Sequence, residues 1–454
     1  MNLANLTRRQ LLADTARTVA GAAAVSTLTA ASMARAASAN ERLVIGMMGT
    51  GGRGQWLLRE ELATQWPDVD IAYLCDVDAK RLHAAMGIVE KAGRPAPTPV
   101  KDFRAILDDK KVDALFVVTP DHWHALPAIL ACQAGKDVFL EKPAAHNAWE
   151  GRKIVEAARK YQRVVQLGTQ TRSGTYTHEA VEFLRAGRIG DIHMARVYNM
   201  VRRPPIDPQP DGPAPENVDY DLWTGPAPLR PFNPNRFHYH WHWCWDFSGG
   251  DIINDGVHQI DAARMLIGRD YPNAVTSTGG KLAYQDAAQT PDTQIAVWEF
   301  DNLMMVFELA LWAPHMQKTP WDYRDTDGFP NWQFNATKIE VHGTKGLMYF
   351  SRHGGGWQAW NPDGKEIANG PGRHPHHPHL ANFFECVRTR RRPNADIEEG
   401  HRSTLLCQMA NISYRLGGRK LIVDGNTESF ANDPEANAML KRPGRPPWII
   451  PENV

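Results

Sequence analysis

Lys142 stands where a lysine could carry a proton during a reaction. It follows the apolar run 137–141 and belongs to the triplet Glu141-Lys142-Pro143. At the end of a buried strand, beside a cationic ligand, its pKa should fall because both surroundings disfavour the ammonium form. The neutral amine could then take a hydroxyl proton. The alternative is an ordinary solvated lysine at a strand end.

His258 is the second candidate for proton transfer. The spacing of apolar residues around it predicts a helix, preceded by Gly249-Gly-Asp and then Asn254-Asp255-Gly. These small and polar residues would bring backbone and polar groups close to the imidazole. Asn254 could orient a hydroxyl group but could not accept its proton, and Asp255 would point about 100° away around a helix. A buried histidine with a purely structural role is the alternative.

A glycine-rich turn follows the apolar run 43–48 and has the spacing of a dinucleotide site. Its first glycine permits a sharp turn, its second admits a phosphate, and its third allows the next helix to pack closely. The predicted contacts are Gly49, Thr50, Gly51, Gly52, Arg53 and Gly54. Asp76 ends the next apolar run, about 20 residues on, where an acid binds ribose and favours NAD over NADP. Arg53 leaves NADP open, because a guanidinium could pair with a 2′-phosphate.

Further strands and helices alternate beyond this turn. The runs 113–119 and 137–141 predict buried parallel strands, with helices at 78–91, 122–134 and 148–159. Ligands bind outside the carboxyl ends of such strands. We therefore expect cofactor contacts from residues just after these strands, namely Thr119, Pro120, His122, His124, Glu141 and Lys142.

Together these motifs resemble the sugar oxidoreductase family of glucose-fructose oxidoreductase, inositol dehydrogenase and the rhizopine-catabolism enzymes. The resemblance covers nearly all of the chain after residue 39. It implies an α/β fold with an N-terminal Rossmann domain and a C-terminal α+β domain. It also implies that Lys142 and His258 flank the sugar carbon that exchanges hydride with a nicotinamide. The family usually has aspartate where this chain has Asn254, so proton transfer would fall on Lys142 and His258.

The chain divides into four predicted parts: a signal peptide at 1–39, a Rossmann domain at 40–165, an α+β domain at 166–430 and a tail at 431–454. Alternating runs between residues 193 and 350 predict a large, mainly antiparallel open sheet, which often supplies an oligomer face. A homo-oligomer, dimer or tetramer, is therefore expected. Gln170 is a candidate cofactor contact and Arg172 a candidate sugar contact. The proline-rich tail should lie on the surface or on a neighbouring subunit.

The segment 233–247 is dense in aromatic and imidazole groups. Flat rings suit the apolar faces of sugars, so Trp241, His242 and Trp243 are candidate substrate contacts. Structural packing is an equally good explanation for the tryptophans. No cysteine pair or carboxylate cluster completes a metal site here, and no metal is predicted. A second histidine group, at 374–379, is predicted to be a loop.

The first 39 residues resemble a twin-arginine signal peptide. Arg8-Arg9 precedes an alanine-rich, weakly apolar stretch at 18–33 and then Ala37-Ser38-Ala39. We expect export to the periplasm or beyond, with no membrane insertion after processing; a retained anchor is the alternative. This route exports folded proteins, and free NAD should be scarce outside the cell. The cofactor would then be tightly held.

Composition fits a soluble enzyme. The formal net charge is zero and no basic stripe suggests a nucleic-acid partner. Five scattered cysteines imply no disulfide framework.

Three functions remain open. The first is an NAD(P)-dependent oxidoreductase acting on a secondary hydroxyl of a sugar or glycoside. The second is a redox-neutral glycoside hydrolase or lyase, which oxidises, eliminates, hydrates and reduces again. Relatives of that type are expected to carry a Tyr-Pro-Thr-His run, which this chain lacks. The third is a non-catalytic sugar-binding protein, which the presence of Asp76, Lys142 and His258 disfavours.

Overall fold

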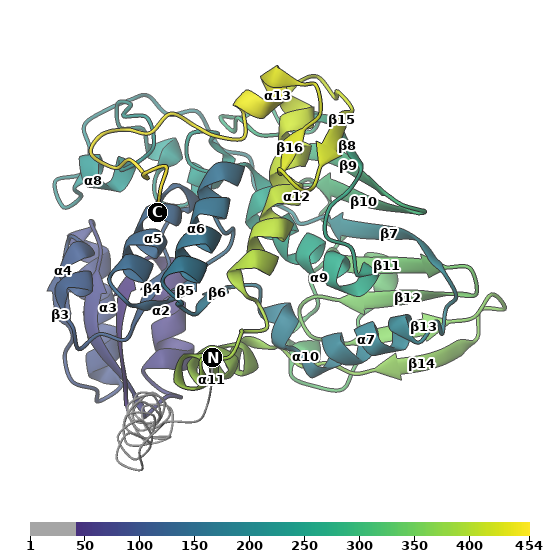
Figure 1. Ribbon diagram of the computed structural model, residues 1–454, viewed down its shortest axis with the longest axis horizontal. Coiled ribbons are helices and arrows are strands. Elements are labelled where there is room, and N and C mark those ends of the chain that lie inside the picture. The colour runs from purple at the N-terminus through teal and green to yellow at the C-terminus, as the bar shows by residue number, and fades with distance from the viewer. Residues whose placement is uncertain (1–41) are drawn as a thin grey trace, which may run out of the picture.

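The structure is a computed structural model that describes residues 42–454. Two sheets, each with its own helices, lie side by side (Figure 1). The predicted signal peptide lies outside the described residues. Within 42–454 no helix is long and apolar enough to cross a membrane. The predicted fold class, a Rossmann domain joined to a domain with a large open sheet, is confirmed.

The first sheet has the strand order β3-β2-β1-β4-β5-β6, all parallel. Its strands are β1 (Leu43–Met48), β2 (Val69–Cys75), β3 (Thr98–Val100), β4 (Ala114–Val117), β5 (Asp137–Leu140) and β6 (Val165–Leu167). Helices alternate with them: α2 (Gly52–Leu57), α3 (Ala79–Lys91), α4 (Arg104–Asp108), α5 (Ala125–Gln133) and α6 (Ala148–Lys160). β4 and β5 are buried along their whole length, as expected of strands covered on both faces.

The helix α2 begins at Gly52, inside the glycine turn itself. A π-helical segment, Leu58–Leu62, follows it directly. α3 has a clear start signal, because the Asp78 side chain accepts hydrogen bonds from the backbone of Lys80 and Arg81.

The second sheet has the order β14-β13-β12-β11-β7-β10-β9-β8-β15-β16. β7 and β10 pair in parallel, and the other neighbours are antiparallel. The strands are β7 (Ile192–Asn199), β8 (Ala274–Gly280), β9 (Thr293–Phe300), β10 (Leu303–Ala310), β11 (Lys338–Gly343), β12 (Gly346–Ser351), β13 (Trp357–Trp360), β14 (Glu366–Gly370), β15 (Leu421–Asp424) and β16 (Ser429–Phe430). The helices in this later part of the chain are α7 (Thr175–Arg185), α8 (Tyr220–Thr224), α9 (Val257–Ile267), α10 (Trp321–Arg324), α11 (His376–Thr389), α12 (Ile397–Arg415) and α13 (Pro434–Ala438).

Two segments from the C-terminal part of the chain, α11 and the tail, pack against the Rossmann domain. The domain boundaries predicted from the sequence did not include these contacts. Leu380, Phe383 and Phe384 of α11 join the apolar core beneath β1 and β4. The tail does not lie free on the surface: Trp448 and Ile450 are buried against the Rossmann helices of the same chain. The tail therefore packs the C-terminal end of the chain against the N-terminal Rossmann domain.

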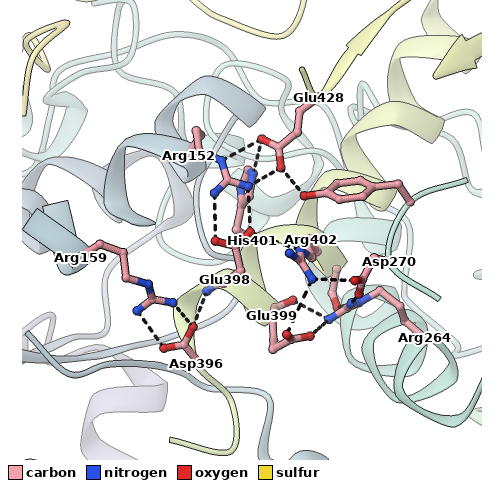
Figure 2. A network of polar contacts seen from close by, with 12 residues as sticks. Arg152, Arg159, Arg264, Asp270, Asp396, Glu398, Glu399, His401, Arg402 and Glu428 are labelled. Atoms are coloured by element: carbon pink, nitrogen blue, oxygen red, sulfur yellow. Dashed lines mark hydrogen bonds and ion pairs between the residues drawn. The ribbon is translucent and has the colours of Figure 1, made fainter. Parts of the chain in front are cut away.

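An ion-pair network fastens α12 between the two domains (Figure 2). Arg152 of α6 binds Glu398 at 2.9 Å and also pairs with Glu428 of the turn between β15 and β16. His401 of α12 contacts Glu428 at 2.9 Å. The guanidinium and its two carboxylates are at most 29% exposed, so their charges interact in a partly dry environment. The network holds α6, α12 and the β15–β16 turn in one arrangement.

Candidate active site

A cavity of about 690 Å³ opens where the glycine turn faces the second domain. Its walls include the ends of β1, β2, β4 and β5 and the beginning of α9. Most of the predicted site residues line it: Gly49, Gly51, Gly52, Arg53, Asp76, Thr119, Pro120, Glu141, Lys142, Gln170, Trp241, His242, Asn254, Asp255 and His258. The structure thus gathers into one cavity residues spread over more than 200 positions.

The glycine turn has the geometry that its sequence predicts. Gly49 has a φ of +96°, and a Cβ atom there would lie 2.4 Å from the Val118 carbonyl oxygen. A Cβ atom at Gly54 would lie 2.3 Å from the carbonyl oxygen of Gly49. Gly52 has open space beside it. Side chains at Gly49 and Gly54 would thus collide with the backbone of the turn and its neighbours, whereas the space beside Gly52 is open to a pyrophosphate, so the residues present fit NAD.

Asp76 connects this turn to β2. Its carboxylate accepts hydrogen bonds from the Thr50 backbone nitrogen at 2.7 Å and from the Thr50 hydroxyl at 2.9 Å. Burial raises the pKa of Asp76, although these hydrogen bonds oppose the shift. Thr50 is fully buried, so it supports the turn from behind the cavity.

Two arginines lie near the turn. Arg53 donates to Glu141 at 2.7 Å and lies 4.7 Å from the ring centre of Trp56. Its guanidinium is therefore already engaged, which the sequence did not show. Arg81, which the sequence analysis did not single out, lines the cavity beside Gly51.

Lys142 is fixed by Asn254. Its Nζ donates to the Asn254 backbone oxygen at 2.5 Å and to the side-chain Oδ1 at 3.1 Å, which leaves one direction of the nitrogen for a ligand. Burial lowers the pKa of Lys142, while Asp121 and Glu141 nearby oppose the shift. The predicted direction of this pKa shift therefore agrees with the structure, with burial as its main cause.

His258 lies in the first turn of α9 and lines the same cavity. Burial, followed by the charges of Arg352 and Lys142, lowers its pKa well below the ordinary value, so the ring is neutral at neutral pH. No hydrogen bond within the described chain holds its ring nitrogens. Both are thus available to a ligand.

Asp255 does not face Lys142 as a free base. It pairs with Arg352 at 2.5 Å and with Lys318 at 2.6 Å, and Arg203 lies 3.4 Å away. Despite burial, these cations lower its pKa well below the ordinary range. A carboxylate held this way accepts protons poorly. Asp255, a catalytic candidate from the sequence alongside Asn254, Lys142 and His258, is therefore placed to hold the neighbouring cations rather than to act as a free base.

Six predicted contacts do not line the cavity: Thr50 and Gly54, which belong to the glycine turn itself, and four residues outside it. His124 bridges the carbonyl oxygens of Thr119 and Pro143, at 2.9 and 2.6 Å, and so positions the two loops. His122 contacts the Trp223 carbonyl oxygen at 3.0 Å. Arg172 forms a buried ion pair with Asp261 at 2.8 Å, and Trp243 belongs to the apolar core. These residues support the site from outside.

The histidines at 374–379 do not form a plain loop. α11 begins at His376, and the rings of His374 and His376 stack with centres 4.0 Å apart along the cavity wall. Within residues 42–454 no group of three His, Cys, Asp or Glu side chains is placed to hold a metal ion. All five cysteines are buried and free.

Sequence reasoning missed several lining residues. Asp121 could have been found, because it directly follows Thr119-Pro120 at the same strand end. The others come from segments without a motif: Arg203, Lys318, Trp321, Arg324, Arg352 and His353. Only folding brings these segments to the site.

Comparison with known proteins identifies the family of the chain. Residues 43–169 match the model of an oxidoreductase family with an NAD-binding Rossmann fold. Residues 206–300 and 339–450 match the C-terminal alpha/beta domain of the same family. The chain therefore belongs to this family, that of glucose-fructose oxidoreductase and inositol dehydrogenase, as the motifs suggested.

Individual relatives share only parts of the chain. A glycosyl hydrolase family 109 protein from Stenotrophomonas maltophilia is 36% identical over 27% of this chain and 28% of its own length. An inositol 2-dehydrogenase from Rubrobacter xylanophilus is 31% identical over 33% of this chain and 42% of its own. The chain thus spans less than half the length of either relative.

The fold recurs in solved structures. The WlbA dehydrogenase from Bordetella pertussis, in complex with NADH and UDP-GlcNAcA, superposes with a TM-score of 0.62 at 20% identity. The match covers 85% of this chain and 99% of that one. At this identity the similarity concerns the fold.

Proposed function

We propose that this protein is an NAD-dependent oxidoreductase that oxidises a secondary hydroxyl group of a sugar or glycoside and holds its cofactor tightly. One observation carries the proposal. The Lys142 amine, fixed by two bonds to Asn254, and the free imidazole of His258 share one cavity with the glycine turn.

The residues divide the chemistry as follows. When bound, NAD⁺ supplies the hydride acceptor. Gly49, Gly51 and Gly52 would hold its pyrophosphate, and Asp76 would hold its ribose. Lys142 in its neutral form takes the hydroxyl proton, and neutral His258 holds the hydroxyl oxygen by a hydrogen bond. Asn254 keeps the lysine nitrogen in place.

Substitution of Lys142 tests this assignment. Lys142→Met preserves the length and apolar packing of the side chain and removes the amine. We expect NAD to remain bound and turnover to fall by about 100-fold or more. Nucleotide content after purification and steady-state turnover measure the two effects. Unchanged turnover would refute the assignment.

A second candidate function is redox-neutral cleavage of a glycoside. The similarity of 27% of the chain to a glycosyl hydrolase family 109 protein supports it. In that reaction the same cofactor would return the hydride to the sugar, and the product would be cleaved without net oxidation. Absence of the Tyr-Pro-Thr-His run makes this the less favoured function.

The protein's location and assembly are also proposals. Arg8-Arg9 and the alanine-rich stretch after it support export by the twin-arginine route. Retention of NAD through purification would accord with both export and tight binding. The wide open sheet supports a homo-oligomer, which light scattering can measure.

A further inference from the structure

Four cationic side chains line the cavity on the second-domain side of Lys142 and His258. They come from the segment after β7, the segment between β10 and β11, and the position just after β12: Arg203, Lys318, Arg324 and Arg352. Arg324 and Arg352 are only 8% and 9% exposed. Such burial disfavours charge unless opposite charges lie nearby.

Only part of this positive charge is balanced by the protein. Asp255 forms ion pairs with three of the cations, Arg352, Lys318 and Arg203, and Asp251 lies 3.2 Å from Arg203. No carboxylate of the described chain lies within ion-pair distance of Arg324. Two carboxylates thus face four cations.

Arg324 is nevertheless held in place. Its Nε donates to the Thr319 carbonyl oxygen at 2.8 Å, and its guanidinium lies 4.0 Å from the ring centre of Trp321. Trp321 lines the cavity although 63% of it is exposed, which places it at the mouth. The outer nitrogens of Arg324 have no hydrogen-bond partner within residues 42–454 and can form a forked contact with a planar anion.

Unpartnered polar atoms surround the same place. Arg203 Nε, His353 Nε2 and His374 Nδ1 are buried without a hydrogen-bond partner in the described part of the chain. Burial and the neighbouring arginines lower the pKa of His374 to about 3, and that of His353 also falls well below its ordinary value. Neutral imidazoles can donate to an anion without adding to the local positive charge.

We propose that the substrate is an anionic carbohydrate whose carboxylate or phosphate group binds Arg324, with Arg203, Lys318 and Arg352 around it. This inference rests on the proposed oxidation of a sugar and narrows its substrate class. The anion completes the charge balance of the cavity wall. Binding of the charged group at Arg324 would also determine which hydroxyl group of the sugar faces Lys142.

Calorimetric titration of the NAD⁺-saturated protein tests this inference. The probes are D-glucuronate, its neutral counterpart D-glucuronamide, D-glucose 6-phosphate and neutral D-glucose. We expect one anionic probe to bind about tenfold or more tightly than its neutral counterpart. Preference for glucuronate would identify a carboxylate site, and preference for the phosphate ester a phosphate site. If neither anion binds more tightly than its counterpart, the inference is wrong.

Substitution of Arg324 locates the effect. Arg324→Gln should abolish the preference for the anion and leave NAD affinity unchanged, because the glycine turn is not altered. Arg391→Gln, at an arginine 76% exposed on the surface, is the matched control and should keep the preference. Preference for anions that survives in Arg324→Gln would also overturn the inference. NADH formation is followed separately: anion preference without oxidation of any probe would count against the proposed function alone.

Discussion

At the scale of single residues, the proposed proton transfer depends on Lys142 and on Asn254, which holds its amine. The amine must be neutral to take a proton, so the rate of oxidation should rise with pH through the lowered pKa of Lys142. Asn254→Asp would place a negative charge beside the ammonium group and favour that form. We expect the pH dependence of kcat/KM to shift to higher pH. Asn302→Asp, in an exposed turn, is the control. An unshifted profile in Asn254→Asp would show that Lys142 does not set the pH dependence.

At the scale of elements, the α6–α12 network contributes stability rather than chemistry. Arg152→Met would remove the cation that Glu398 and Glu428 share, leaving Arg402 beside Glu398 and His401 beside Glu428 in this partly buried place. We expect the free energy of unfolding in urea to fall by about 2 kcal/mol. Arg391→Gln removes an exposed pair and should change it by less than about 0.5 kcal/mol. Equal effects of the two substitutions would mean that the network adds nothing beyond surface charge.

Elements also explain what the sequence could predict. The Rossmann strands and the cavity residues at their ends follow from local signals, since glycine spacing and apolar runs act over a few residues. Arg172 could not be placed correctly from its position after β6. Its partner Asp261 lies 89 positions away, and no residue near Arg172 in the sequence indicates that the two side chains pair. The cavity-lining cations Arg203, Lys318 and Arg352 were missed for the same reason. They come from distant segments, and each of them pairs with Asp255 in the folded protein.

At the scale of the whole molecule, many buried histidines make the fold sensitive to acid. Burial lowers the pKa of His122 to about 3 and that of His379 to about 4, below the value of about 6.5 in the unfolded chain. Below about pH 6.5 the unfolded chain therefore binds protons that the folded protein does not. Stability is present above that pH and should fall by about 1.4 kcal/mol per pH unit for each such histidine.

Urea unfolding between about pH 7 and pH 5 measures this loss, in a range where most carboxylates do not yet titrate. His122→Asn should reduce the slope, and His315→Asn, on the surface, should not. A free energy of unfolding that stays constant over this range would contradict the expectation.

The central claim is net oxidation of a sugar hydroxyl by bound NAD. Mass spectrometry of products, after incubating the purified protein with simple neutral and anionic glycosides with and without added NAD⁺, tests it most directly. The account predicts a product that has lost two hydrogen atoms and an equal amount of NADH. A cleaved sugar at unchanged oxidation level would contradict the claim and indicate redox-neutral hydrolysis instead.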